Sequence, residues 1–410
     1  MANLKKNTLY LYILTASNYI FGIATLPYVT RILGPEEYGR LGFALAFGAY
    51  FTIIIDFGFI LSATRQVTLA RNEKESLSQI LTSVTYAKIF LGTLLLIIIY
   101  LSSLFFSPIK DSLSLILLFL LLSIISGSIP DFLYRGLENM KIVTFRGVLV
   151  RGIATCLTFI FLKHPGQVYM VPLFQIIGSL VALFWISMDL YRNLHIKYIR
   201  PSFSKIAYHL KDSFPYFISR IASSIYGVTN TIILGFVFPK SNIIGFYSSA
   251  EKFKDLGSMA CSPVADSFYP YMIREKNYKI LFKTLILMEL LILLACVIGY
   301  IWSEEICIIA FGKDFAPSGE ILRWFIPIIA VILPIYMLGF PALSPINKTK
   351  WANYTVEIAM VNQLIWIIIL FFTHNINAIN LCRITILSEY ICLFIRIIII
   401  YRSRQQIKSL

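Results

Sequence analysis

Apolar runs of about 20 residues recur along this chain from one end to the other, with short polar gaps between them. A helix needs about 20 apolar residues to cross the hydrocarbon core of a bilayer. Only 14% of the 410 residues are charged, whereas a soluble globular domain carries about 25%. The sequence therefore predicts an integral membrane protein.

The runs predict helices and not the strands of an outer-membrane barrel. Barrel strands alternate in polarity and are about 10 residues long, whereas the run LGTLLLIIIYLSSLFF at residues 91–106 does not alternate. The first run follows Lys5 and Lys6 like a signal peptide, but it is longer and lacks a clean cleavage site, so we expect a retained span. About twelve transmembrane helices are predicted, near residues 9–33, 41–63, 80–106, 113–134, 142–162, 168–190, 212–236, 243–270, 281–302, 321–341, 354–373 and 377–400.

Basic residues are distributed unequally between the two sets of loops. If both termini lie on one side, that side carries 23 Lys and Arg residues and the opposite side carries 7. Cytoplasmic loops hold the excess of Lys and Arg, so both termini are predicted to be cytoplasmic. The net charge of +15 then reflects topology and contact with anionic headgroups, and no nucleic-acid partner is expected.

The sequence lacks the patterns of common catalytic and cofactor sites. Its six cysteines form no CxxC pair and are expected to be small buried apolar residues, and its four histidines form no HExxH motif. The pair Gly312-Lys313 is followed by Asp314 rather than by Ser or Thr, which excludes a P-loop. The longest non-cytoplasmic loop, near 303–320, is short for a catalytic domain. We therefore expect no metal, no cofactor and no enzymatic activity.

A similar pattern of residues recurs about 206 positions apart: a Pro-containing turn, then a glycine (Gly39 and Gly245), then the start of an apolar span. The segment LGPEEYGRLGFALAF from Leu33 is loosely matched by FPKSNIIGFYSSAEKF from Phe238. Internal repeats are common in secondary transporters, whose substrate site lies between the repeats. The sequence thus predicts two six-helix halves, residues 1–195 and 196–410, around a central cavity.

Three segments of the first half resemble the motifs of a known family. They are LPYVTRILGPEEYGRLGFALAF from Leu26, DFGFILSATRQVTLARN from Asp56 and PDFLYRGLENMKIVTFR from Pro130. In this order they are similar to the polysaccharide transporter family, the O-antigen flippases of Gram-negative bacteria. The match over the second half is weaker and rests on the span count and on FYSSAEKF.

The resemblance implies a fold similar to multidrug and toxic compound extrusion (MATE) transporters and lipid II flippases. It implies that undecaprenyl-diphosphate-linked oligosaccharide moves from the cytoplasmic to the periplasmic leaflet of the inner membrane by alternating access. A polysaccharide polymerase and a chain-length regulator are then candidate partners.

Charged residues inside the predicted spans mark the candidate site, because a charge at the bilayer centre costs about 2.5 to 3.5 kcal/mol on insertion scales. One polar stripe about 80° wide runs along the eighth span and contains Glu251, Asp255, Ser258, Ser262 and Asp266, flanked by Lys252 and Lys254. A second stripe, on the seventh span, contains Ser213, Arg220, Ser224, Gly227 and Thr231. Arg220 is expected about 12 Å inside the cytoplasmic end of that span.

These charges have two interpretations. They can be structural ion pairs, for instance Lys252 with Asp255, or Arg220 with a carboxylate on a neighbouring helix. Alternatively they line a hydrophilic cavity, where guanidinium and ammonium groups bind phosphate while carboxylates bind sugar hydroxyls or a coupling proton or sodium ion. The candidate substrate-binding residues are Arg220, Lys252, Lys254 and Lys88. The candidate cation-coupling or cavity-lining residues are Asp56, Glu251, Asp255, Asp266, Glu289 and Glu357.

Two other functions stay open from the sequence. A cation-coupled exporter of small drugs could use the same fold, but the three motifs favour the flippase. A membrane polysaccharide polymerase or ligase is expected to need a large periplasmic loop with catalytic groups, and the sequence has none.

The unequal numbers of Lys and Arg in the loops on the two sides predict the membrane topology. Alkaline phosphatase fused after Lys110 or Lys240 should be active, because these residues are expected on the periplasmic side. Fusions after Arg71 or Arg274 should be inactive. The reverse pattern of activity would contradict the predicted orientation.

Overall fold

The computed structural model describes the backbone of residues 2–408 and their side chains except those of 2–5, 8, 219, 222–227 and 408. Within residues 2–408 it contains helices and no strand, which confirms the all-α prediction. The helices of the first half of the chain are α1 (Ala2–Asp56), α2 (Phe59–Leu69), α3 (Lys74–Phe105), α4 (Ser107–Asp111), α5 (Leu113–Ser128), α6 (Asp131–Gly136), α7 (Met140–Phe161), η1 (Pro165–Gln167), α8 (Met170–Asp189) and η2 (Leu190–Leu194). They are followed by α9 (Phe203–Val237), α10 (Asn242–Glu275), α11 (Tyr278–Ile301), α12 (Ser303–Phe311), η3 (Lys313–Phe315), α13 (Ser318–Leu338), α14 (Phe340–Leu343), η4 (Ser344–Ile346), α15 (Thr349–Phe372), α16 (Ala378–Arg402) and α17 (Arg404–Lys408).

The long helix α1 is broken at Gly34, whose backbone has φ 71° and ψ 174°. Its 55 residues would be about 80 Å long if straight, far more than the hydrocarbon core of about 30 Å. Glycine adopts a positive φ without steric cost, and Pro35, which follows, fits the first turn of a new helix. The break separates the first two predicted spans.

The second predicted span ends earlier than its predicted limit at residue 63. Phe57 and Gly58 both have positive φ, so the helix stops at Asp56 and α2 begins at Phe59. The apolar pattern did not reveal this stop, because the residues on both sides of it are equally hydrophobic.

Nine segments of the described chain are long and apolar enough to cross a membrane, and the chain is a multi-pass membrane protein. One of these segments, Leu9–Leu69, contains two of the predicted spans. The helices α9 and α10 are not among these segments. The undescribed side chains 222–227 interrupt α9, whose later part, Val228–Val237, is a shorter apolar segment, and polar and charged residues lower the hydropathy of α10. The nine segments are thus fewer than the twelve predicted spans.

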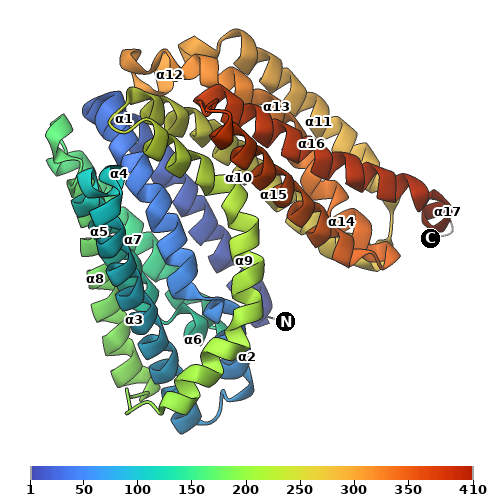
Figure 1. Cartoon of the computed structure of the whole chain (residues 1–410). Helices are drawn as coiled ribbons and strands as arrows, with labels where there is room; N and C mark the ends of the chain where they lie inside the picture. The colour runs from blue at the N-terminus through green and yellow to red at the C-terminus, as the bar shows by residue number, and fades with distance from the viewer. Residues whose placement is uncertain (1, 409–410) are drawn as a thin grey trace. The chain divides into compact units, whose positions relative to one another are not determined.

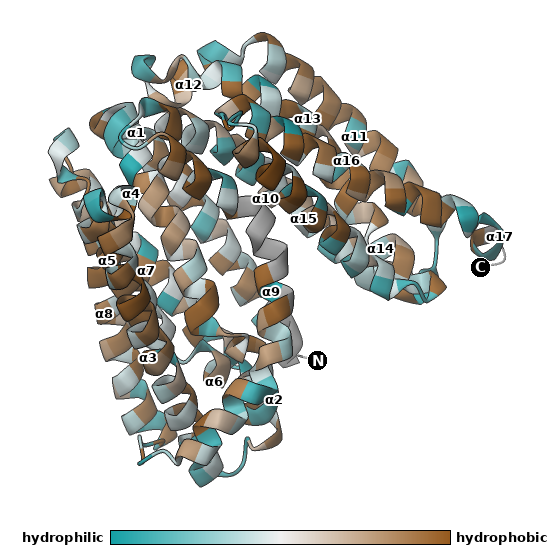
Figure 2. Cartoon of the chain, viewed as in Figure 1, coloured by the Kyte–Doolittle hydropathy of each residue, from teal (hydrophilic) through white to brown (hydrophobic). Residues whose placement is uncertain are grey.

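The chain folds into two compact units, unit 1 (Met1–Ile221) and unit 2 (Ala222–Leu410). In unit 1, α1, α5, α7 and α8 pack along one another, and α2 and α6 contact each other at one end (Figure 1). In unit 2, α13 packs against α10, α11 and α16. Brown, hydrophobic residues dominate α5 and α8 in unit 1 and α13 in unit 2 (Figure 2), as expected of helices inside a bilayer.

The first half of α9 packs against α2 in unit 1. Asp212 accepts hydrogen bonds from Arg65 Nη2 at 2.8 Å and from Gln66 Nε2 at 2.7 Å, and Ser213 Oγ lies 2.5 Å from Ser62 Oγ. These contacts place residues 203–221 with unit 1. The division into repeats at residue 195 is an inference from sequence and stays a prediction.

The cysteines differ in one respect from the expectation. Five are buried, but Cys156 is exposed on α7. All six are free thiols, and the described part of the chain contains no group of three or more His, Cys, Asp or Glu side chains that could hold a metal ion.

Gly58 is predicted to be essential for docking α9 onto α2. A Cβ at Gly58 would lie 2.7 Å from Tyr216 Cβ and 3.0 Å from Ser213 O, and its φ is +80°. A strained backbone of this kind costs about 1 to 3 kcal/mol for a residue other than glycine, before the clash is counted. Gly58→Ala should therefore lower the thermal unfolding midpoint of the detergent-purified protein.

The matched control is Gly299→Ala, because a Cβ there makes only an ordinary contact of 3.6 Å with Ile326. We expect this control to unfold at or above the wild-type midpoint, since alanine favours a helix. Equal midpoints for the two variants would show that Gly58 is not a constrained position.

Candidate functional site

A cluster of three charged side chains forms where α1 ends. The Asp56 carboxylate forms an ion pair with Arg220 of α9 and another with Lys88 of α3, whose Nζ lies 3.6 Å from Oδ1. Lys88 also donates a hydrogen bond to the backbone oxygen of Gly127 at 3.1 Å, and its Nζ lies 5.7 Å from the ring centre of Phe132. Asp56 thus links three helices of unit 1.

Lys88 and Arg220 differ in exposure, although both contact Asp56. The Lys88 side chain is 7% exposed, whereas that of Arg220 is 43% exposed. A buried ammonium group requires a counter-charge, so the contacts of Lys88 favour a structural role. Arg220 is the more accessible of the two cations.

Two ion pairs lie along α10 in unit 2. Lys254 Nζ is 3.1 Å from Glu251 Oε1, and Lys252 Nζ is 3.0 Å from Asp255 Oδ2. The first pair is the more buried, and Thr231 Oγ1 donates to Glu251 Oε2 at 3.3 Å. The structural pair proposed for Lys252 and Asp255 is therefore present, while a role of these residues in binding stays a prediction.

The other predicted carboxylates have different surroundings. Asp266 on α10 and Glu357 on α15 are exposed, and Glu289 on α11 is half-buried. The stripe on the seventh span can be followed only in part, because the surroundings of Ser224 and Gly227 are not described.

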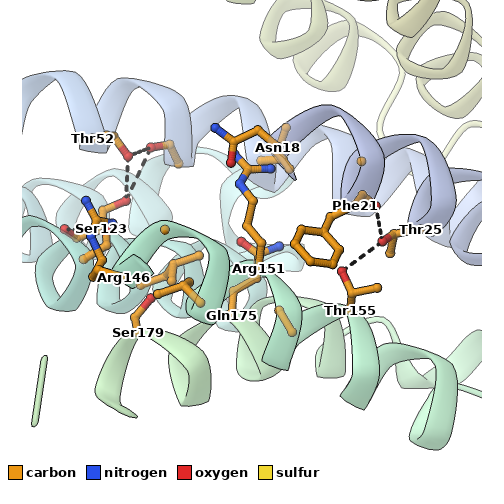
Figure 3. Close-up of a pocket in the computed structure, with 18 of the residues that line it drawn as sticks. Asn18, Phe21, Thr25, Thr52, Ser123, Arg146, Arg151, Thr155, Gln175 and Ser179 are labelled. Atoms are coloured by element: carbon orange, nitrogen blue, oxygen red, sulfur yellow. Dashed lines mark hydrogen bonds between the residues drawn. The ribbon is translucent and has the colours of Figure 1, made fainter. Parts of the chain in front are cut away.

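A cavity of about 580 Å³ lies inside unit 1, among α1, α5, α6, α7 and α8 (Figure 3). Its volume is within the range of about 300 to 1,000 Å³ typical of small-molecule sites. Its polar lining residues are Asn18, Thr25, Thr52, Ser123, Ser126, Asp131, Arg135, Arg146, Arg151, Thr155, Thr158, Gln175 and Ser179. Apolar residues such as Phe21, Leu45, Phe119 and Val150 complete the lining.

The cavity carries an excess of positive charge. Its ionisable lining residues are three arginines and one aspartate, which gives a formal charge of +2. Arg146 forms an ion pair with Asp131, but neither Arg135 nor Arg151 has a hydrogen-bond or ion-pair partner among the described residues. The Nε atoms of Arg135 and Arg146 are buried without a partner. These donors can bind an anion.

Arg151 extends from α7 across the cavity toward Asn18 of α1 (Figure 3). A pair of hydroxyl groups lies on each side of Arg151. Thr52 Oγ1 is 3.3 Å from Ser123 Oγ, and Thr25 Oγ1 is 3.3 Å from Thr155 Oγ1. The lining therefore combines guanidinium donors with uncharged donors and acceptors, which suits an anionic ligand that also carries hydroxyl groups.

The cavity and the Asp56 cluster adjoin each other. Asp56 interacts electrostatically with Arg135, and Lys88 interacts with Arg146. Because Asp56 neutralises part of the nearby positive charge, it reduces repulsion among these cations. The two clusters form one charged region within unit 1.

Sequence reasoning missed the cavity arginines. The 23 basic residues expected on the cytoplasmic side include Arg135, Arg146 and Arg151. The helix α7 begins at Met140, so Arg146 and Arg151 lie about 9 Å and 16 Å along it. Their position inside the predicted span 142–162 was the available signal. Without these two residues the basic excess is 21 to 7, and the predicted orientation is unchanged.

A family model and two known proteins match the sequence of this chain. The family model for the polysaccharide biosynthesis protein family matches residues 4–276. A protein of Escherichia coli (strain K12) is 28% identical over 270 residues, which cover 65% of this chain and 64% of the relative. A protein of Shigella dysenteriae is 28% identical over 354 residues, which cover 85% of this chain and 88% of the relative. Each carries the name "Putative O-antigen transporter".

Two solved structures have the same fold. The lipid II flippase MurJ in an inward closed conformation gives a TM-score of 0.75 at 16% identity, over 96% of this chain and 87% of that one. An inward-facing MATE family multidrug resistance transporter gives 0.70 at 14% identity, over 98% of each chain. These likenesses confirm the predicted MATE-like fold, and at such identities they concern the fold alone.

The Asp56 cluster predicts an asymmetry between two single variants. Asp56→Asn should be strongly destabilising, by about 3 to 5 kcal/mol, because it leaves the buried Lys88 without a counter-charge. Lys88→Met should cost less, since Asp56 keeps Arg220. In the Asp56→Asn background, Lys88→Met should restore stability. Thermal unfolding of the four proteins in detergent tests this, and equal losses in the two single variants would contradict it.

Proposed function

This chain belongs to the polysaccharide biosynthesis protein family, and from that premise we propose that it is a lipid-linked oligosaccharide flippase. In this proposal it moves an undecaprenyl-diphosphate-linked repeat unit, such as an O-antigen unit, across the bacterial inner membrane by alternating access. Both termini lie in the cytoplasm. The relatives named as O-antigen transporters support this cargo, and the charged cavity of unit 1 is the observation that carries it.

The chemistry of the cavity suits the headgroup of such a cargo. A guanidinium group can hold two phosphate oxygens through parallel hydrogen bonds, and no partner among the described residues must first be displaced from Arg135 or Arg151. The hydroxyl and amide groups of Thr52, Ser123 and Gln175 can bind the sugar nearest the diphosphate. In our proposal the long polyprenyl chain stays in the lipid while the headgroup occupies the cavity.

The cations predicted from the sequence take secondary roles in this proposal. Arg220 is 43% exposed and Lys252 is 32% exposed, so each can bind cargo while it keeps its carboxylate neighbour. Lys88 and Lys254 are more buried, and we assign them to the internal structure of their units. Asp266 and Glu357, which are exposed, stay candidates for binding sugar hydroxyls.

The proposed task involves no covalent chemistry. Moving an intact headgroup between leaflets breaks and forms no bond, so the protein acts as a transporter and not as an enzyme. The partners in this proposal are the lipid-linked oligosaccharide, the bilayer, a coupling proton or sodium ion, and a polymerase and chain-length regulator that use the product.

The charge of the cavity also helps to separate this function from drug export. A site with a formal charge of +2 repels a cationic drug and attracts a diphosphate. The likeness to a MATE transporter concerns the fold, and one fold can serve many functions. The cavity therefore supports the flippase over an exporter of cationic drugs.

Substitution of Arg151 tests whether the cavity binds the cargo, because Arg151 lines the cavity and no described residue depends on it for an ion pair. Arg151→Ala should abolish surface polysaccharide in a complementation assay while the protein reaches the membrane at normal levels. Loss of a charged hydrogen bond of about 1.5 to 3 kcal/mol corresponds to roughly a tenfold or greater loss of affinity. Arg151→Lys should keep partial function, since an ammonium group holds phosphate less specifically.

Lys141→Ala is the matched control. Lys141 is an exposed cation in the first turn of the same helix and does not line the cavity, so this variant should complement fully. Full complementation by Arg151→Ala at normal expression would falsify the proposed binding role of the cavity.

A further inference from the structure

Glu289 lies near the middle of α11, one of the most apolar membrane-crossing helices of the chain. It is eleven residues from the start of the helix and twelve from its end, or about 16 to 18 Å from either end. Leu285, Ile292 and Cys296 share its helical face and pack toward the interior of unit 2. Leu290, Leu291 and Leu294, on the other faces, are exposed, as expected of contacts with lipid. A carboxyl group therefore lies in an apolar seam at mid-membrane depth.

Glu289 has no counter-charge in the described part of the chain. Its Oε2 atom is buried without a hydrogen-bond partner, and no Lys, Arg or His side chain forms an ion pair with it there. The titratable side chains that face it are Cys261 of α10, Cys296 of α11 and Tyr390 of α16, and none of these is a cation. The described residues of α13, which packs extensively against α11, add no charge to its surroundings.

The other predicted carboxylates provide the contrast. Asp56, Glu251 and Asp255 each contact at least one cation. Asp266 and Glu357 are exposed. Among these six, Glu289 is the one whose buried oxygen has neither a cation nor a hydrogen-bond donor. The ionised form of such a group is strongly disfavoured, and a bound proton removes the charge.

We propose that Glu289 is a proton-binding site of unit 2, neutral in this conformation, through which a proton gradient drives transport. The binding of the proton stands on the surroundings of Glu289 alone, whereas the coupling to transport rests on the proposed function. The proton is carried by one carboxyl oxygen, and its release leaves the carboxylate.

The neighbouring helices offer a way to change the surroundings of Glu289. Prolines interrupt α10 at Pro263 and Pro270 and α13 at Pro327 and Pro334, and each proline removes a backbone hydrogen bond and favours a bend. Cys261, which faces Glu289, is two residues from Pro263. A bend at these positions would alter the access of water to the carboxyl group, and with it the stability of the bound proton.

The first experiment detects the protonated carboxyl group without transport. The full-length protein in liposomes is treated with dicyclohexylcarbodiimide and its peptides are mapped by mass spectrometry. The carboxyl proton moves to a carbodiimide nitrogen, the carboxyl oxygen bonds to the central carbon, and an acyl shift to nitrogen gives a stable N-acylurea with no leaving group. We expect an adduct on Glu289 that decreases as the pH is raised.

Variants define the specificity of this reaction. Glu289→Gln should remove the adduct, and Glu357→Gln, which alters an exposed carboxylate on α15, should leave it unchanged. If the reagent does not reach the site, infrared spectroscopy decides: a carbonyl band of a protonated carboxylic acid should be present in the wild type and absent in Glu289→Gln. Absence of that band at neutral pH would overturn the proposal.

The second experiment tests coupling. Purified protein in vesicles is given a lipid-linked oligosaccharide, and flipping is compared with and without an imposed pH gradient. The gradient should accelerate the wild type, and in Glu289→Gln the ratio of the two rates should fall to about one. An undiminished ratio would overturn the coupling role. A wild type that does not flip this cargo at all would refute the proposed function, while the carbodiimide and infrared results would still stand.

Discussion

Hydrocarbon cannot solvate a charge, and this constraint explains the placement of the ionised groups inside the helices of this chain. Lys88 is almost fully buried and is held by Asp56 and by the oxygen of Gly127. Arg220 brings α9 to the same carboxylate. Three helices of unit 1 are therefore joined through one side chain, and in unit 2 the pair formed by Glu251 and Lys254 neutralises the buried charges of α10.

Two cations of unit 1 have no ion-pair partner in the described part of the chain. Arg135 and Arg151 lie inside the membrane-embedded bundle of unit 1 and line a cavity with hydroxyl and amide groups. Arg135 is half-buried and Arg151 is exposed, so both guanidinium groups are accessible to water or to a ligand. In the proposed function these donors bind the diphosphate headgroup of the cargo and then release it.

The backbone interrupts its helices at two places that helix propensity and hydropathy alone do not predict. Positive φ at Gly34 divides α1, and positive φ at Phe57 and Gly58 ends its second part beside the Asp56 cluster. Because α9 packs closely on Gly58, the position of Arg220 depends on the absence of a side chain there. The charged cluster and the packing of α9 are thus parts of one arrangement.

The membrane class, the helical fold and the resemblance to polysaccharide transporters could be predicted from the sequence, because apolar run length and local motifs are properties of neighbouring residues. It also identified Asp56, Lys88 and Arg220 as charges that lipid cannot host, and Lys252 with Asp255 as a candidate pair, since their spacing fits one helix turn. It could not show that Asp56 holds Lys88 and Arg220 together, because these residues are far apart in sequence and meet only when α1, α3 and α9 pack. Nor could it separate Arg146 and Arg151 from the loop cations, because their exposure depends on which face of α7 lines the cavity. The packing of the helices determines which charges neutralise one another and which, like Arg151 and Glu289, have no partner among the described residues.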